Sequence, residues 1–198
     1  MISDDSQRVF FSSKRPATAH CFDLARRSLL AADLEINRVW SERSTVTEHA
    51  EKAQQFQVLL IDLHFFFISL RNLYRYLEKI VVDPTYAHLK PDLDRLNTRW
   101  FRHYSSGREA FEHIDQRLPG EKHEDKIVEI EENGARRRIH YGLYLSKGIF
   151  THSDLKWDIS LPTFTSIKND VDMFLQAVVQ ASNATLDNGA PPYGAPSS

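Results

Sequence analysis

Cysteine is almost missing from this chain. Cys21 is the single cysteine among 198 residues, so no disulfide can form within the chain. A lone thiol is typical of proteins kept in a reducing compartment. The first residues also lack the basic and then apolar order of a signal peptide. These two absences predict a cytoplasmic protein.

Glycine and long hydrophobic runs are also scarce. The seven glycines are too sparse for a phosphate-binding loop or a dinucleotide-binding fingerprint. The most apolar run, Val58 to Leu70, is interrupted by Asp62 and His64 and is too short to span a bilayer. We therefore expect no nucleotide cofactor bound in these ways and no membrane partner.

Charge of one sign and metal-binding patterns are missing as well. The net charge is −2, so any affinity for nucleic acid must come from a local basic patch. No histidine has an acidic residue three positions before it, which excludes the Glu-x-x-His pattern of di-iron bundles. One cysteine cannot build a zinc site of the usual kind. We expect no metal and no cofactor.

What the chain does contain is apolar periodicity at helical spacing. It predicts four helices: residues 16–40, a helix from a Thr45–Glu48 capping box to Val82, residues 91–118, and a helix opened by Pro162. The residues expected to face the core are Cys21, Leu24, Ala31, Leu34 and Val39; then Phe65, Phe66, Phe67, Leu70, Leu73 and Leu77; then Leu93, Leu96, Trp100, Tyr104, Gly107, Phe111, Ile114 and Leu118; and finally Phe164, Ile167, Val171, Phe174, Leu175 and Val178.

The third helix allows two interpretations. Its apolar row keeps its phase through Gly107, which predicts one continuous helix ended by Pro119 and Gly120. Alternatively, Ser106 and Glu109 have capping-box spacing and could start a new helix. The second interpretation places Arg108 in a first helical turn.

Between the third and fourth helices the period changes to that of strands. Asn133-Gly134 predicts a hairpin over residues 126–145, in which Glu131 faces Arg136, Glu129 faces Arg138 and Ile130 faces Arg137. Lys147-Gly148 indicates a second turn, and Leu155, Trp157 and Ile159 alternate as a further short strand. The expected architecture is mainly α: one domain over residues 1–184, a four-helix bundle with a small antiparallel β insertion at about residues 124–160. The tail over residues 185–198 is expected to be disordered, and residues 1–15 irregular.

A basic row accompanies the third helix. From Arg95 to Arg108 there are four arginines and no carboxylate. On a helical projection Arg95, Arg99, Arg102, His113 and Arg117 fall within about 60° of one another. Such a row could follow the phosphates of RNA. A solvated face balanced by acids on other helices explains it equally well.

Arg108 and His113 are separated by four residues, near the end of a late helix in a helical chain. This pair resembles the Arg-x4-His motif of the HEPN superfamily, whose members are helical bundles and often metal-independent ribonucleases. The resemblance covers residues 108–120 and otherwise rests on the order of the helices. It implies that Arg108 and His113 are catalytic, that the chain forms a homodimer with the two motifs near the interface, and that RNA is the substrate. Many relatives are toxins or phage-defence effectors with a neutralising partner, so a cognate antitoxin is implied as well.

Other interpretations of the chain and of these residues remain open at this point. Active family members often have Asn, Asp or His directly after the arginine, whereas this chain has Glu109. A non-catalytic HEPN-like module that binds nucleic acid, a nucleotide or a protein is therefore the second hypothesis. A hydrolase assembled from scattered carboxylates and histidines is the third. Glu109 lies one turn before His113 and could fix its tautomer. Structural roles are also available: Arg108 and Glu112 could form a surface pair worth about 0.3–0.5 kcal/mol, and His113 could be an ordinary exposed residue.

Overall fold

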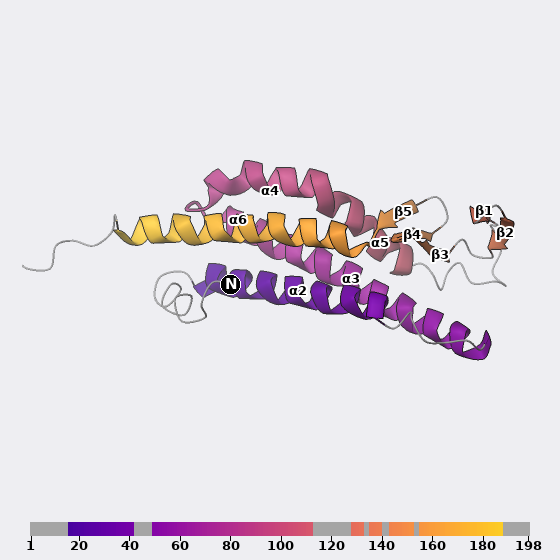
Figure 1. Cartoon of the computed structure of the whole chain (residues 1–198). Coiled ribbons are helices and arrows are strands. Elements are labelled where there is room, and N and C mark those ends of the chain that lie inside the picture. Colours follow the sequence, from indigo (N-terminus) through magenta and orange to yellow (C-terminus); the bar gives the residue numbers. More distant parts are fainter. Residues whose placement is uncertain are drawn as a thin grey trace, which may run out of the picture.

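The computed structural model describes residues 16–41, 49–112, 128–132, 135–139, 143–152 and 155–187. Within these ranges the chain is mainly helical, and its long helices lie alongside one another with small antiparallel sheets at one end (Figure 1). The expected mainly helical architecture, with four helices and a small antiparallel β insertion between the third and the fourth, is confirmed. Among the described helices, none has the length and apolar character needed to cross a membrane.

Helix α2 (Pro16–Ser41) has the predicted bounds but buries a different row. The buried side chains are Thr18, Phe22, Ala25, Leu29, Ala32, Ile36 and Val39. The prediction was wrong for Leu34, which is 54% exposed, and Cys21, Leu24 and Ala31 are only half-buried. Two alanines, Ala25 and Ala32, are fully buried. Small side chains let a neighbouring helix approach closely, and hydrophobicity alone does not distinguish their row from the larger leucines beside it.

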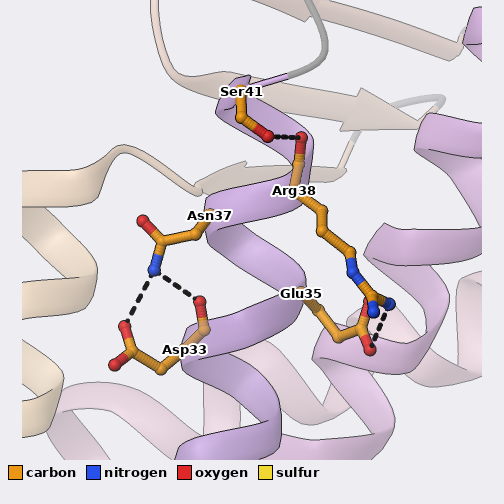
Figure 2. Close-up of polar contacts among 5 residues, drawn as sticks. All are labelled: Asp33, Glu35, Asn37, Arg38 and Ser41. Atoms are coloured by element: carbon orange, nitrogen blue, oxygen red, sulfur yellow. Dashed lines mark hydrogen bonds and ion pairs between the residues drawn. The ribbon is translucent and has the colours of Figure 1, made fainter.

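The outward side of α2 carries local polar contacts (Figure 2). Asn37 Nδ2 donates to the backbone oxygen of Asp33 at 2.7 Å and to its Oδ1 at 3.1 Å. Arg38 pairs with Glu35 at 3.3 Å, and Ser41 Oγ donates to the Arg38 carbonyl at 3.2 Å. Asp33 also links α2 to the last helix, because its Oδ2 accepts from Lys168 Nζ at 2.7 Å.

Helix α3 (His49–Val82) forms the centre of the core. Phe66, Phe67, Leu70, Leu73 and Leu77 are buried as predicted, whereas Phe65 is 52% exposed. Three consecutive residues of a helix are each rotated by about 100°, so the three phenylalanines cannot all face inward. The helix ends as predicted before Pro84, where Asp83 Oδ1 accepts from the Thr85 amide at 3.0 Å and its Oδ2 accepts from Thr18 Oγ1 at 3.0 Å.

The predicted third helix consists of three joined segments. A short 3₁₀ turn, η2 (Ala87–Leu89), leads into α4 (Lys90–Leu96), the π-helical segment η3 (Asn97–Phe101) and α5 (Arg102–Glu112). The π segment was not predicted. It adds one residue to a helical turn. The next buried residue after Leu96 is therefore Phe101 and not the predicted Trp100, which is only half-buried. The continuous helix through Gly107 is confirmed, and the alternative start at Ser106 is wrong.

The first hairpin has the predicted register. Strand β1 (Val128–Glu132) pairs with β2 (Ala135–Ile139), with Glu131 opposite Arg136, Glu129 opposite Arg138 and Ile130 opposite Arg137. The predicted span was too long, because Leu143–Ser146 is not part of this hairpin. It forms β3 in a second sheet, since the tight turn that follows it supplies a nearer partner strand.

The second sheet has the order β3–β4–β5, with β4 (Ile149–His152) in the centre and β5 (Leu155–Asp158) at one edge. Lys147 and Gly148 both have positive φ, 47° and 88°, which is the geometry of a two-residue type I′ turn and confirms the predicted turn. Phe150 lies opposite Trp157, and both are fully buried. The alternation predicted around Trp157 holds for Ile159, whereas Leu155 is 37% exposed.

Helix α6 (Leu161–Asp187) confirms its whole predicted row, since all six expected core residues are buried. The tail was predicted to be disordered from Thr185, but the helix continues to Asp187. The predictions for residues 1–15, for the Thr45–Glu48 cap, for the helix end at Leu118 and for residues 188–198 lie outside the described residues.

Candidate functional site

The Arg108 end of α5 lies against the middle of α3. Gly107 makes this approach possible: a Cβ on it would lie 2.4 Å from both Cδ1 and Cε1 of Phe67. Real Cβ atoms do not come so close to a ring, so the helix needs glycine at this position. Arg108 is half-buried and Glu109 is exposed. His113 lies outside the described residues, so only the arginine side of the Arg108–His113 motif is placed.

An aromatic cluster lies under this turn of α5. Phe67 is its centre, with ring centroids 5.3 Å from Trp157, 5.8 Å from Phe111, 6.2 Å from Tyr104 and 6.4 Å from Phe150. These rings come from α3, α5 and the second sheet, and Phe67, Phe150 and Trp157 are fully buried. Contacts of this kind add about 0.5–1.5 kcal/mol per pair to the burial of apolar area. The turn that carries Arg108 therefore has a rigid base.

His64 of α3 is a neighbour of the motif that sequence reasoning missed. Its ring is nearly parallel to that of Phe111, with centroids 5.4 Å apart and an interplanar angle of 5°. Its Nε2 is buried and has no hydrogen-bond partner among the residues that the structure describes. Such an atom is unusual in a folded protein and often marks a place where a water or a ligand binds. In the sequence His64 is visible only as an interruption of an apolar run, which gives no hint of its contact with α5.

The three candidate RNA-binding arginines have different surroundings. Arg95 pairs with Asp92 at 2.8 Å, one turn earlier on the same helix. Arg99 pairs with Asp170 of α6 at 2.9 Å, and its guanidinium lies 4.7 Å from the centre of the Trp100 ring. Arg102 is exposed. The charges of Arg95 and Arg99 are therefore balanced by carboxylates, in line with the solvated-face interpretation of this row.

Trp100 completes the contact between η3 and α6. Its Nε1 donates to Asp170 Oδ2 at 2.8 Å, the same oxygen that Arg99 contacts at 2.9 Å. The π segment is what turns residues 99 and 100 towards α6, because it adds one residue between the buried Leu96 and Phe101. A rare backbone feature thus has a structural role here.

The β insertion is attached to α5 directly before Arg108. Trp157 Nε1 donates to the His103 carbonyl at 3.1 Å and to Ser106 Oγ at 3.2 Å. The Tyr104 hydroxyl donates to the backbone oxygen of Asp158. Burial, with the nearby Asp158 charge, raises the pKa of Tyr104 well above its ordinary value. Tyr104 is therefore a neutral donor throughout the physiological range.

Asp158 joins the sheet to the start of α6. Burial disfavours its charge, but hydrogen bonds from Ser160 and Thr163 prevail and lower the pKa of Asp158. The Ser160 amide donates to Oδ1 at 2.9 Å, and Thr163 Oγ1 donates to Oδ2 at 2.7 Å. A carboxylate that accepts such bonds stays ionised and suits the positive end of a helix dipole.

Metal ligands do not gather in the described part of the chain, where no group of three or more His, Cys, Asp or Glu residues could hold an ion. Comparison with known proteins gives no match: no protein-family model, no curated protein and no solved structure is found to be similar to this chain.

Proposed function

We propose that this chain is a metal-independent endoribonuclease of the HEPN type that acts through Arg108 and His113 in the cytoplasm. The observation that supports this most is the continuity of α5 across Gly107. The Arg-x4-His motif thus begins inside a helix that packs on a helical bundle, which is the setting that the HEPN resemblance implies. The resemblance itself rests on the motif.

The chemistry assigns a role to each residue. Cleavage of RNA by its own 2′-hydroxyl needs a base for that hydroxyl, an acid for the leaving 5′-oxygen and stabilisation of charge on phosphorus. His113 serves the proton transfers, because imidazole can donate or accept near neutral pH. Arg108 binds the phosphate oxygens through its planar fork of donors. Glu109 is exposed and precedes His113 by four positions in the sequence, and its role in the proposal is to fix the histidine tautomer.

One copy of the motif is not sufficient for this mechanism. Five positions along an ideal helix correspond to a rotation of about 140°, so the spacing of Arg108 and His113 does not by itself bring the two side chains to one face. One motif also supplies a single histidine for two proton transfers. A two-fold dimer brings two arginines and two histidines to one cleft. It therefore supplies the second histidine and lets an arginine of one copy act beside a histidine of the other. By the same resemblance, the enzyme acts as a toxin or phage-defence effector that a cognate antitoxin or another partner protein neutralises.

The test is cleavage of structured RNA in the presence of EDTA. Wild-type protein should leave 2′,3′-cyclic phosphate ends, and Arg108→Ala and His113→Ala should each lose the activity. His88→Ala is a matched control, because His88 is an exposed histidine in η2, on a different segment from the motif. Equal cleavage by every variant, or no cleavage by the wild type, contradicts the proposed ribonuclease activity.

A second function is favoured by two features. Glu109 stands where active relatives often have Asn, Asp or His, and Arg95 and Arg99 are already paired with carboxylates. A non-catalytic HEPN-like module that binds nucleic acid, a nucleotide or a protein is the alternative. Retained RNA binding without cleavage in the same assay selects it, and Glu109→Asn then tests whether the residue after Arg108 suppresses activity.

A further inference from the structure

Two arginines of α3 differ from most surface arginines of the bundle. Arg71 is half-buried and Arg75 is exposed, and they lie one helical turn apart. In the part of the chain that the structure describes, neither makes an ion pair or a hydrogen bond. Other exposed arginines pair with carboxylates at 2.8–3.3 Å, namely Arg27, Arg38, Arg95 and Arg99. The charges of Arg71 and Arg75 are therefore available to a ligand.

Lys79 continues this line one turn after Arg75. Its ammonium lies 5.8 Å from the centre of the Tyr76 ring, and among the described residues it has no carboxylate partner. Arg71, Arg75 and Lys79, the α3 basic row, thus follow one another at four-residue spacing over two helical turns.

The acid closest to this row in the sequence of α3 is Glu78, which is engaged by another side chain. Burial and a hydrogen bond to Glu78 raise the pKa of Tyr74 to about 12. The Glu78 carboxylate therefore interacts with the Tyr74 hydroxyl. Even when Glu78 is counted, three positive charges stand against one negative charge along the row.

Helices α3 and α5, which hold the row and Arg108, run antiparallel to each other. His64 of α3 stacks on Phe111 of α5, with ring centroids 5.4 Å apart. Ten positions later on α3, Tyr74 contacts Phe101, which lies ten positions earlier along the chain than Phe111, with ring centroids 5.2 Å apart.

The row and Arg108 lie on the same side of this contact. Phe67 and Gly107 face each other across it. Relative to Phe67, Arg71 is rotated by about 40° and Arg75 by about 80°. Relative to Gly107, Arg108 is rotated by about 100° in the same sense. In an antiparallel pair of helices, rotations of the same sense away from the contact lead to the same side, so the three arginines share it.

Two observed contacts identify the sides independently. His64 and Phe111 are rotated by about 60° and 40° in the sense of the arginines, and their rings stack as this geometry requires. Ser106 is rotated by about 100° in the opposite sense and accepts from Trp157 of the second sheet at 3.2 Å. The three arginines therefore lie on the side of the α3–α5 contact that faces away from the second sheet.

We propose that the α3 basic row binds the phosphates of the RNA strand that Arg108 holds at the motif. Arg71 is one turn, about 6 Å, along α3 from Phe67, which faces the glycine next to Arg108, so the row begins beside the motif. Arginine offers phosphate a planar fork of donors, and such contacts position a strand without reading its sequence. The inference deepens the proposed function and rests on it for the identity of the anion as RNA.

The proposal moves phosphate binding from the third helix of the sequence prediction to α3. Arg95 and Arg99 are paired with carboxylates. Arg102 is rotated by about 140° from Gly107 in the sense opposite to Arg108, so it does not share the side of the row.

The first experiment measures binding separately from cleavage. The full chain is titrated against a fluorescein-labelled single-stranded 2′-O-methyl RNA, which lacks the attacking hydroxyl, and fluorescence anisotropy is followed at several KCl concentrations. Each phosphate contact with a single strand contributes about 0.7 to the slope of log K against log salt. Arg71→Gln and Arg75→Gln should each reduce this slope by about 0.7 and weaken binding by about three- to fivefold near 0.15 M salt. Arg71→Lys, which keeps the charge, should retain the slope.

Arg27→Gln is the matched control. It removes the same charge from an exposed arginine of α2 and should bind like the wild type. Circular dichroism checks that every variant is folded. A wild type that does not bind this RNA, glutamine variants that bind with the wild-type slope, or an equal loss in Arg27→Gln overturns the proposal. So does binding of the wild type to phosphatidylserine vesicles and not to RNA, which would assign the row to a membrane surface.

Cleavage of structured RNA is followed in parallel, so that the two proposals can fail independently. Binding through the row without any cleavage by the wild type supports the row and rejects the nuclease. Cleavage that depends on His113, with wild-type binding in Arg71→Gln and Arg75→Gln, supports the nuclease and overturns the row. A KM raised about three- to fivefold at unchanged kcat in these two variants, with both constants retained in Arg27→Gln, supports the complete proposal.

Discussion

Replacing Gly107 by alanine sets two effects of opposite sign against each other. Within a helix, glycine to alanine normally stabilises by about 1 kcal/mol, because the backbone of glycine loses more freedom on folding. Here the new Cβ would lie 2.4 Å from two carbons of the Phe67 ring. Phe67 is fully buried among five other aromatic rings, which restrict any movement of its own ring.

Overpacking of a well-packed core costs about 1–3 kcal/mol, and a contact this short belongs at the upper end of that range. The clash should therefore outweigh the gain in helix propensity, and Gly107→Ala should lower the free energy of unfolding by about 1–2 kcal/mol. For a chain of this size that corresponds to a fall in melting temperature of roughly 2–8 °C. Urea unfolding followed by circular dichroism measures it.

Two further variants isolate the cause. Ser105→Ala, two residues earlier on α5, removes only a hydroxyl that bonds back to the Arg102 carbonyl and should change stability little. Phe67→Leu removes the ring atoms that the new Cβ would meet. Gly107→Ala should then cost less in the Phe67→Leu background than in the wild type, because the two sites interact directly. A Gly107→Ala protein as stable as the wild type would show that α5 and α3 are not in the contact described.

Four other substitutions have definite expected outcomes. The raised pKa of Tyr104 means that its hydroxyl is a weaker acid in the folded than in the unfolded protein. Its contribution to stability is therefore complete below about pH 10 and falls as the pH rises towards the folded pKa. Tyr104→Phe should flatten the alkaline part of the stability–pH profile, and an unchanged profile contradicts this. Trp157→Phe should lower the free energy of unfolding by about 1–2 kcal/mol, because both hydrogen bonds of the indole N–H are lost. Ser106→Ala should lower it by less, since the His103 carbonyl still accepts from Trp157. Equal losses would contradict these two hydrogen bonds. His64→Phe should raise the free energy of unfolding by about 1 kcal/mol, because it keeps an aromatic ring and replaces a buried nitrogen that has no hydrogen-bond partner in the described part of the chain. A loss of stability in urea unfolding would mean that Nε2 has a partner in the folded protein.

The helices could be predicted where large apolar residues define one row. The row of α6 was right at every position, because each of its members is large and, apart from the exposed Met173, the intervening residues are polar or small. In α2 the same reasoning selected Leu34, which is 54% exposed, and overlooked Ala25 and Ala32, which are fully buried. Which of two overlapping rows faces the core is decided by how closely a neighbouring helix can approach. That information lies in the neighbour and not in the local sequence.

The strands, too, were predictable in one part and not in another. The register of β1 and β2 followed from Asn133-Gly134 alone, because a two-residue turn determines every pair beyond it. The assignment of residues 143–145 failed, because those residues could extend the first hairpin or begin the second. The π segment was missed for a related reason: an extra residue between Leu96 and Phe101 leaves the apolar spacing readable in two ways.

The candidate site was predictable along the helix but not across the bundle. The sequence placed Arg108 on a continuous helix and identified Gly107 as part of its buried row, and both predictions are confirmed. The neighbours of this turn, His64 and Phe67, come from α3, and a pattern within one helix contains no information about them. The acids that pair with the basic row could be anticipated only as a class, and Asp170 of α6 supplies one of them.

The β insertion has a physical role that a bundle alone does not explain. Phe150 and Trp157 of the insertion are fully buried and belong to the same core as α3 and α6. Trp157 holds α5 by bonds to the His103 carbonyl and Ser106 Oγ, within the two turns that precede Arg108. Gly107 brings the same stretch of helix against Phe67. The position of Arg108 is therefore determined by α3 on one side and by the second sheet on the other. The proposed role of Arg108 in binding phosphate requires a fixed backbone, since a shift of about 1 Å at a catalytic group is enough to lose activity. The insertion is accordingly part of the core that supports the motif and not a module added to a finished bundle.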